Sequence, residues 1–297
     1  MSNPKSPAWY GGGISTIVGD QPGVGNIYYV DGTNGLDTND GLTPDTPMLT
    51  LTTAIDATTA NANDYVIVLG YPGAAVGETW PVAVNKAKVH IVGTPAQASP
   101  SPLINAPGDT ACFLVSASNV EIAGLEFSAG ASHGCIETSG GVWKGNIHDN
   151  FFGWQDAGLY GIWLSNNTDN VDCPQWKIRD NYFGEKLTGH NIWIAYNSTR
   201  TIIENNFFRG VASGAIGIYI DQAGADVGAI LNNVFKVADA ATGEAITCIA
   251  GTIGTVIAGN MTGEGQVAMG NVPYRDLGGC HWSINYYDVQ AIMPETV

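Results

Sequence analysis

Basic residues are scarce in this sequence. Its 297 residues include 11 Lys and Arg but 27 Asp and Glu, which gives a formal net charge of −16 at pH 7. Such an acidic chain repels phosphate backbones and anionic lipid headgroups, so we expect neither nucleic acid nor a membrane as a partner. Charged residues make up only 13% of the chain, and 39 glycines are present. Few charges and many glycines favour an all-β protein with many tight turns.

Long apolar runs and paired cysteines are missing as well. No run of about 18 apolar residues exists to form a membrane-spanning helix. The start MSNPKSPAWYGGG lacks the apolar region of a secretory signal, so we expect synthesis in a cytoplasm without secretion. The cysteines are odd in number and form no C-x-x-C pair. We therefore expect reduced and mostly buried thiols at Cys112, Cys135, Cys173, Cys248 and Cys280.

An internal repeat organises the second half of the chain. Five segments align on one asparagine: NIHDNFFG, KIRDNYFG, IIENNFFR, AILNNVFK and VIAGNMTG. The aligned residues are Asn150, Asn181, Asn206, Asn233 and Asn260, at spacings of 31, 25, 27 and 27 residues. An isoleucine precedes each asparagine by three positions, and a phenylalanine follows the first four by two positions, at Phe152, Phe183, Phe208 and Phe235. A period of this length indicates stacked coils.

Each coil has room for three short strands that pair in parallel with their copies about 4.8 Å away. The isoleucine register continues backwards through Ile122, Ile91 and Val68, which gives about eight rungs. We expect the asparagines to adopt the left-handed conformation at a bend and to form a hydrogen-bonded ladder, with the phenylalanines stacked inside. The segment TLTTAIDATT predicts a helix near residues 50–60, capped by Thr50, that covers the open first coil.

The strand YYVDGTNG, the turn-rich LDTNDGLTPDTP, the helix and the coils with their asparagine column resemble the pectate-lyase-like superfamily. The resemblance implies an all-β fold, a single-stranded right-handed parallel β-helix over residues 27–265. An N-terminal arm would occupy residues 1–26, and a C-terminal cap or contact segment residues 266–297. Members of the superfamily include polysaccharide lyases, polygalacturonases, and bacteriophage tailspikes, head fibres and decoration proteins.

Enzymes with this fold bring carboxylates together at the bond they cleave, or use a Ca²⁺ cluster with a basic residue. The segments around Asp169 and His190 match fragments of the polygalacturonase pattern, but its D-D pair and R-x-K are missing. The best cluster occupies equivalent sites on three successive coils, with two aspartates beside it: His148, Arg179, Glu204, Asp149 and Asp180. This cluster is either a catalytic group or a solvated charge ladder.

A row of large aromatic side chains recurs on another predicted strand. In GIWLS, NIWIA and GIYID, strand alternation points Trp163, Trp193 and Tyr219 away from the core. Such a row is costly to leave in water. We expect either a carbohydrate, whose apolar ring faces stack on aromatic side chains, or a neighbouring subunit to cover it.

One loop resembles a calcium site. Asp37, Asn39 and Asp40 precede Gly41, but the D-x-D-x-D-G spacing of a calcium loop is not met. Turn formation is therefore the preferred interpretation, with Ca²⁺ as the alternative, and we predict no other cofactor.

Two hypotheses about function follow. The first is a bacteriophage virion structural protein, a head decoration or fibre protein or a non-enzymatic tail spike. It would assemble as a trimer through β-helix faces and contact other virion proteins through residues 1–26. The alternative is a polysaccharide lyase or glycoside hydrolase that acts on a host surface glycan, with Asp149, Asp180, Glu204 and Asp221 as candidate carboxylates. The incomplete catalytic patterns favour a protein that is not an enzyme.

Overall fold

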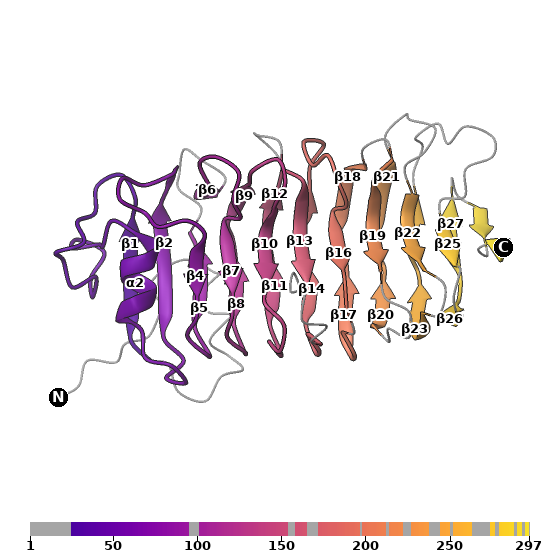
Figure 1. The fold of residues 1–297 in the computed structure, drawn as a ribbon, viewed down its shortest axis with the longest axis horizontal. Coiled ribbons are helices and arrows are strands. Elements are labelled where there is room, and N and C mark those ends of the chain that lie inside the picture. Colours follow the sequence, from indigo (N-terminus) through magenta and orange to yellow (C-terminus); the bar gives the residue numbers. More distant parts are fainter. Residues whose placement is uncertain are drawn as a thin grey trace.

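The computed structural model shows a rod of stacked β-coils that runs from the N-terminal to the C-terminal end (Figure 1). It describes residues 25–94, 101–153, 158–164, 172–196, 198–211, 214–221, 227–237, 244–249, 252–262, 274–276, 279–287, 290–292 and 295–296. Of the predicted arm at residues 1–26, only residues 25 and 26 are among the described residues. Asp169 lies outside them.

Three sheets run the length of the stack, because each coil contributes one short strand to each sheet. Sheet A contains β1 (Ile27–Asp31), β2 (Tyr65–Gly70), β5 (His90–Gly93), β8 (Glu121–Ala123), β11 (Asn146–His148), β14 (Lys177–Arg179), β17 (Thr201–Glu204), β20 (Gly228–Leu231), β23 (Ile253–Ala258) and β26 (Gly279–Trp282). Sheet B contains β3 (Pro72–Gly73), β6 (Leu103–Asn105), β9 (Glu126–Ser128), β12 (Phe151–Phe152), β15 (Tyr182–Phe183), β18 (Phe207–Val211), β21 (Val234–Val237), β24 (Met261–Thr262), β27 (Asn285–Tyr287) and β28 (Gln290–Ile292). Sheet C contains β4 (Val82–Val84), β7 (Phe113–Val115), β10 (Gly134–Thr138), β13 (Tyr160–Leu164), β16 (Ile192–Ile194), β19 (Ile216–Ile220), β22 (Glu244–Cys248), β25 (Tyr274–Asp276) and β29 (Glu295–Thr296).

This arrangement confirms the predicted all-β parallel β-helix. Neighbouring strands pair in parallel in all three sheets, and β27 with β28 is the antiparallel pair among the described strands. Sheets A and B each hold ten strands, which exceeds the predicted eight rungs. The register also differs at the N-terminal end, where Val66 rather than Val68 pairs with Ile91.

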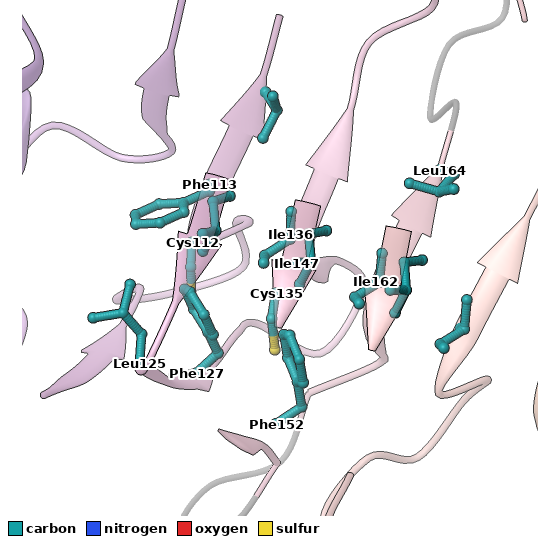
Figure 2. Packing of buried hydrophobic residues seen from close by; sticks show 14 of the residues in the cluster. Cys112, Phe113, Leu125, Phe127, Cys135, Ile136, Ile147, Phe152, Ile162 and Leu164 are labelled. Carbon is teal, nitrogen blue, oxygen red and sulfur yellow. The ribbon is translucent and has the colours of Figure 1, made fainter. Parts of the chain in front are cut away.

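The interior is filled by columns of identical side chains, because parallel pairing in register places each repeat residue beside its copy (Figure 2). Phe152, Phe183, Phe208 and Phe235 are fully buried. Their rings stack with centroid separations of 4.9, 4.7 and 4.4 Å. Four of the five predicted thiols are buried, Cys280 is partly buried, and all five are free.

The predicted asparagine ladder is present and fully hydrogen bonded. Asn181 illustrates the pattern: its Nδ2 donates to Asn206 Oδ1 at 3.0 Å and to the Ile147 carbonyl at 2.9 Å. Its Oδ1 accepts from both the backbone N–H and Nδ2 of Asn150. The ladder continues through Asn233 and Asn260 to a sixth member, Asn285, which the alignment had missed.

The left-handed residue at each bend is the one before the ladder asparagine, which corrects the sequence prediction. Positive φ values near 55° occur at Asp149, Asp180, Asn205 and Asn232, and Gly259 takes the same position with φ 69°. Asp, Asn and Gly tolerate this conformation better than other residues do. The first residue of each pair therefore makes the bend, and the second makes the ladder.

The predicted helix covers the first coils. Helix α2 (Leu51–Ala57) starts at Thr50, whose side chain accepts a hydrogen bond from the Thr53 N–H. Leu51, Ala54 and Ile55 are buried and belong to the central core. The helix is shorter than the predicted 50–60. Among the described residues, no helix is long and apolar enough to cross a membrane.

The C-terminal segment does not leave the repeat where predicted. Beyond residue 265, β25, β26 and β27 add one more strand to each sheet in parallel register. The antiparallel strand β28 then pairs with β27. The coils therefore continue past the predicted boundary.

Candidate functional site

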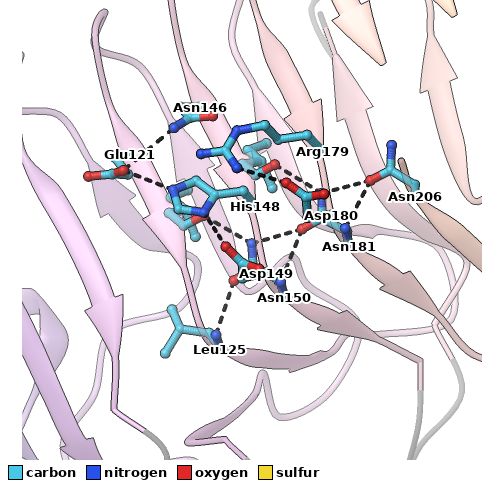
Figure 3. Close-up of polar contacts among 12 residues, drawn as sticks. Glu121, Leu125, Asn146, His148, Asp149, Asn150, Arg179, Asp180, Asn181 and Asn206 are labelled. Atoms are coloured by element: carbon cyan, nitrogen blue, oxygen red, sulfur yellow. Dashed lines mark hydrogen bonds and ion pairs between the residues drawn. The ribbon is translucent and has the colours of Figure 1, made fainter. Parts of the chain in front are cut away.

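The first candidate site lies on the outer face of sheet A (Figure 3). Parallel register places His148, Arg179 and Glu204 at equivalent positions on β11, β14 and β17, as predicted. The sequence had missed Glu121 on β8, which accepts a hydrogen bond from His148 Nε2 at 2.8 Å. On its other ring nitrogen, His148 Nδ1 lies 2.7 Å from Asp149 Oδ2.

The chain of contacts continues towards the N-terminal end. Glu121 Oε2 lies 2.6 Å from Nδ1 of His90 on β5, and the His90 ring stacks on Tyr65 at 4.3 Å. Glu121, His148 and His90 side chains are 12, 5 and 7% exposed, whereas Asp149 is 62% exposed. A chain of four ionisable groups thus runs from solvent into a covered part of the sheet surface.

Hydrogen bonding determines the protonation of the ionisable groups in this row on sheet A. Burial disfavours the ionised form of Glu121, but the bonds to His148 and His90 outweigh it and lower its pKa to about 2. Burial likewise disfavours the charged form of His148, but the bonds to Asp149 and Glu121 raise its pKa. The bond from His148 lowers the pKa of Asp149. His148 is therefore an imidazolium held between two carboxylates.

This arrangement suits a structural role better than catalysis. Both ring nitrogens of His148 and both carboxylate oxygens of Glu121 are already engaged, so neither is oriented towards a substrate. Arg179 Nη1 pairs with Asp180 at 2.8 Å rather than with Glu204. Glu204 forms no ion pair within the part of the chain that the structure describes. A charge ladder accounts for these contacts, and the roles of the five residues stay predictions.

The second candidate site lies on the outer face of sheet C. Register pairs Trp163 with Trp193 and Trp193 with Tyr219, as predicted, and adds Glu137 before them and Thr247 after them. The two indole rings stack at 4.5 Å with an interplanar angle of 10°. All three aromatic side chains are partly buried.

Two further aromatic residues complete this group. Tyr160 packs against Trp163 at 5.3 Å and Trp193 at 4.9 Å, and His190 lies 4.6 Å from Tyr219. We call the five residues the aromatic surface: Tyr160, Trp163, His190, Trp193 and Tyr219. The sequence predicted three of these as one row, and it named His190 only as part of a polygalacturonase-like fragment.

Carboxylates border the aromatic surface. Asp221, after β19, accepts a hydrogen bond from the Tyr219 hydroxyl at 3.0 Å. Glu137 on β10 accepts one from the Gly134 N–H at 2.7 Å and lies 3.1 Å from His133 Nδ1. Glu244 on β22 accepts a hydrogen bond from Thr247. Acidic groups thus stand at both ends of the aromatic surface.

Burial and the neighbouring carboxylates shift the pKa values of Tyr160, Tyr219 and His190. Burial raises the pKa of Tyr160, and the charges of Asp221 and Glu137 add to it. Burial, together with the bond to Asp221, raises the pKa of Tyr219 to about 12. Burial lowers the pKa of His190 to about 4, so this imidazole is neutral at neutral pH. The aromatic surface is uncharged, and the groups around it are negative.

Two donors of the aromatic surface are unused. Nε1 of Trp163 and Nε1 of Trp193 are shielded from solvent and find no hydrogen-bond partner among the described residues. An unpaired donor of this kind costs about 1–3 kcal/mol.

No metal site is apparent in the described part of the chain, where no group of three His, Cys, Asp or Glu side chains is arranged to hold an ion. In the calcium-like loop, Asp37 accepts hydrogen bonds from Leu49 N–H and from Thr50. Asp40 accepts from the Leu42 N–H, and Asn39 donates to the Pro47 carbonyl. These hydrogen bonds belong to the turns of this loop, and the Ca²⁺ alternative stays a prediction.

Comparisons with known proteins bear on the fold. No family model and no curated protein matches the chain. A GH136 lacto-N-biosidase from Eubacterium ramulus, as its selenomethionine derivative, superposes with a TM-score of 0.53 at 12% identity, over 88% of this chain and 56% of that chain. An alginate lyase from Paenibacillus sp. str. FPU-7 superposes with a TM-score of 0.46 at 15% identity, over 80% of this chain and 96% of that chain.

The chain has the parallel β-helix fold. At 12% identity the lacto-N-biosidase shares the fold alone, and this β-helix spans about half of its length. The superposition on the lyase is too loose to support an argument. Function has to be argued from the side chains of this β-helix.

The residues that sequence reasoning missed share one property. Glu121, His90, Glu137 and Tyr160 all lie outside the asparagine-based repeat segments. For Glu121 and His90 the predicted register of Ile122 and Ile91 with Ile147 already implied the positions, and the pairing confirms that register, but their outward side chains were not compared. A comparison of the outward residues of each sheet would have found them.

Proposed function

We propose that this β-helix binds a polysaccharide on the outer face of sheet C, and that its function is that of a carbohydrate-active protein. The observation that carries the proposal is the aromatic surface bordered by carboxylates. Sugar rings have apolar faces that pack on aromatic rings and hydroxyl groups that pair with carboxylates and N–H donors. The aromatic surface with Asp221 offers an apolar ring contact and a carboxylate side by side.

The orientation of the rings defines where a sugar packs. Trp163 and Trp193 stack face to face, so these two inner faces are used within the protein. A sugar would contact the ring edges and the outer faces at the ends of the row. Because the row crosses neighbouring strands, a linear glycan lies parallel to the axis of the stack.

Binding is better supported than cleavage. Glu137 on β10 and Asp221 after β19 lie on strands three spacings apart, about 14 Å along the stack, whereas paired carboxyl groups of glycosidases lie about 5–9.5 Å apart. The predicted lyase or hydrolase activity on a host surface glycan remains part of the proposal. Hydrolase activity of the same protein would be measured as new reducing ends, and lyase activity as the absorbance of unsaturated products.

The test is a glycan array followed by calorimetric titration of the best oligosaccharide. We expect Trp193→Ala to weaken binding about tenfold, because the loss of its ring-edge contact, together with the support it gives the Trp163 ring, would amount to about 1.4 kcal/mol. Trp143→Ala is the matched control, since Trp143 is 52% exposed and lies outside sheet C. Trp193→Phe keeps a ring in place should the alanine variant unfold. Equal binding by all variants, or none by the wild type, contradicts the proposal.

A second candidate function is supported by sheet B. Its outer row runs through Phe151, Tyr182 and Phe207 and continues to Met261 and Tyr286. The last three are exposed at 40, 41 and 41%. An apolar row of this length favours contact with a second copy of the chain. The second candidate is therefore self-association through sheet B, and the trimer and the virion role stay predictions.

Light scattering tests the second candidate. A homotrimer that becomes a monomer in Phe207→Asp supports assembly through sheet B. A monomeric wild type contradicts it and leaves glycan binding as the single proposal.

A further inference from the structure

The strands that carry the aromatic surface contain no basic side chain. From β4 to β22, the strands of sheet C read VAV, FLV, GCIET, YGIWL, IWI, IGIYI and EAITC. The first Lys or Arg in this sheet is Arg275 on β25, whose backbone pairs with Thr247. Sheet A has Lys177 and Arg179, and sheet B has Arg209 and Lys236. The described strands β4 to β22 of sheet C thus differ from sheets A and B in carrying no Lys or Arg.

Two histidines are basic groups that lie at the aromatic surface in the described part of the chain. His190 has a pKa of about 4 because burial disfavours its charged form. His133 lies against Glu137 at the β10 end, 3.1 Å away. Carboxylates face the same region from three elements, with Glu137 on β10, Asp221 after β19 and Glu244 on β22. At neutral pH the potential over the aromatic surface is negative.

We infer that the surface selects glycans by charge: it binds amine-bearing sugars most tightly, neutral sugars next, and uronate-containing chains least. The inference rests on the proposed glycan binding and adds the substrate class. A carboxylate on each sugar would approach Asp221 without a counter-cation on these strands. An ammonium group would instead pair with Asp221, whose Oδ1 already accepts the Tyr219 hydroxyl and whose second oxygen can accept again.

Electrostatics of this kind depends on salt and on distance. The contacts are near the surface, so each pair contributes modestly and is screened at high ionic strength. The net charge of −16 adds a long-range attraction for any cationic chain, wherever it binds. A test therefore has to separate the charge of this face from the charge of the whole protein.

The experiment compares hexamers of glucosamine, glucose and galacturonate by calorimetry at low and moderate salt. We expect glucosamine to bind about fivefold tighter than glucose, with a difference that shrinks as salt rises. Asp221→Asn keeps an acceptor for Tyr219 but removes the charge. It should lower the ratio of glucosamine to galacturonate affinity about threefold. Glu204→Gln on sheet A is the matched control, since it makes the same change in net charge on another face.

The outcomes separate the two proposals. Galacturonate binding that equals or exceeds glucose binding overturns the charge selection alone. An equal effect of Asp221→Asn and Glu204→Gln also overturns it, because the preference then reflects net charge. No binding by any hexamer overturns the proposed function, and the inference with it.

Discussion

The outer faces of sheets A and C present ionisable groups on the same scaffold, but their charges are balanced differently. On sheet A, the His148 imidazolium lies between Glu121 and Asp149, and Arg179 pairs with Asp180. On sheet C, carboxylates surround neutral aromatic rings on strands without Lys or Arg. The sheet A groups satisfy one another. The sheet C groups are carboxylates beside partly buried aromatic rings, and no Lys or Arg of the described strands β4 to β22 balances them.

The largest effect on stability should come from sheet A. Glu121→Ala removes the carboxylate shared by His90 and His148, and we expect a loss of about 3–5 kcal/mol in the free energy of unfolding. Glu204→Ala, on the same face but without an ion pair, should change it by less than about 0.5 kcal/mol. Urea unfolding measures both. Similar small losses in the two variants would contradict a structural role for the chain of four groups.

The pH dependence of stability should reflect the ionisable groups Glu121 and His148 on sheet A. The pKa of Glu121 is lowered to about 2, so its stabilising effect is present above its ordinary value of 4.5 and is lost as pH falls towards 2. The pKa of His148 is raised, so its effect is present below 6.5 and is lost as pH rises through the higher folded value. Asp149, His90 and Arg179 are the charged or titratable groups nearby.

Urea midpoints from pH 3 to pH 9 measure this dependence. Wild type should lose more stability than Glu121→Gln between pH 5 and pH 3, since the variant has no charge to lose. Parallel curves would show that the many surface carboxylates, rather than this group, control acid unfolding.

A smaller effect on stability is expected at Asn191, whose side-chain amide is buried and unpaired within the described part of the chain. It shows that an unpaired polar group on sheet C need not face a ligand. Both amide atoms of Asn191 lack partners among the described residues, and the side chain is 1% exposed. Gly161 and Gly217 hold the same place in neighbouring strands, where a Cβ would come within 2.7 Å of Phe183 and Phe235 ring atoms. Asn191 is thus a core residue.

We expect Asn191→Ala to raise the free energy of unfolding by roughly 1 kcal/mol, since it removes a buried and unpaired amide. Glycan binding should stay unchanged. A loss of binding with no gain in stability would place Asn191 in the ligand site instead.

The repeat made the interior predictable, whereas the outer faces were only partly so. The asparagine and phenylalanine columns are visible in sequence because each position is constrained by an identical neighbour in the next coil. The outer row of Trp163, Trp193 and Tyr219 followed from simple alternation. Glu121 and Glu137 were missed because the repeat was compared at its inward residues, although Ile122 beside Glu121 was already in register with Ile91 and Ile147. No repeat constrains residues of that kind.

The central claim is that sheet C faces a ligand and that the sheet A cluster is structural. Both faces can be followed in one sample by nuclear magnetic resonance of the indole and imidazole N–H groups during titration with an oligosaccharide. We predict that the indole signals of Trp163 and Trp193 shift while the ring signals of His90 and His148 stay in place. Shifts at the two histidines without shifts at the two indoles would contradict the account.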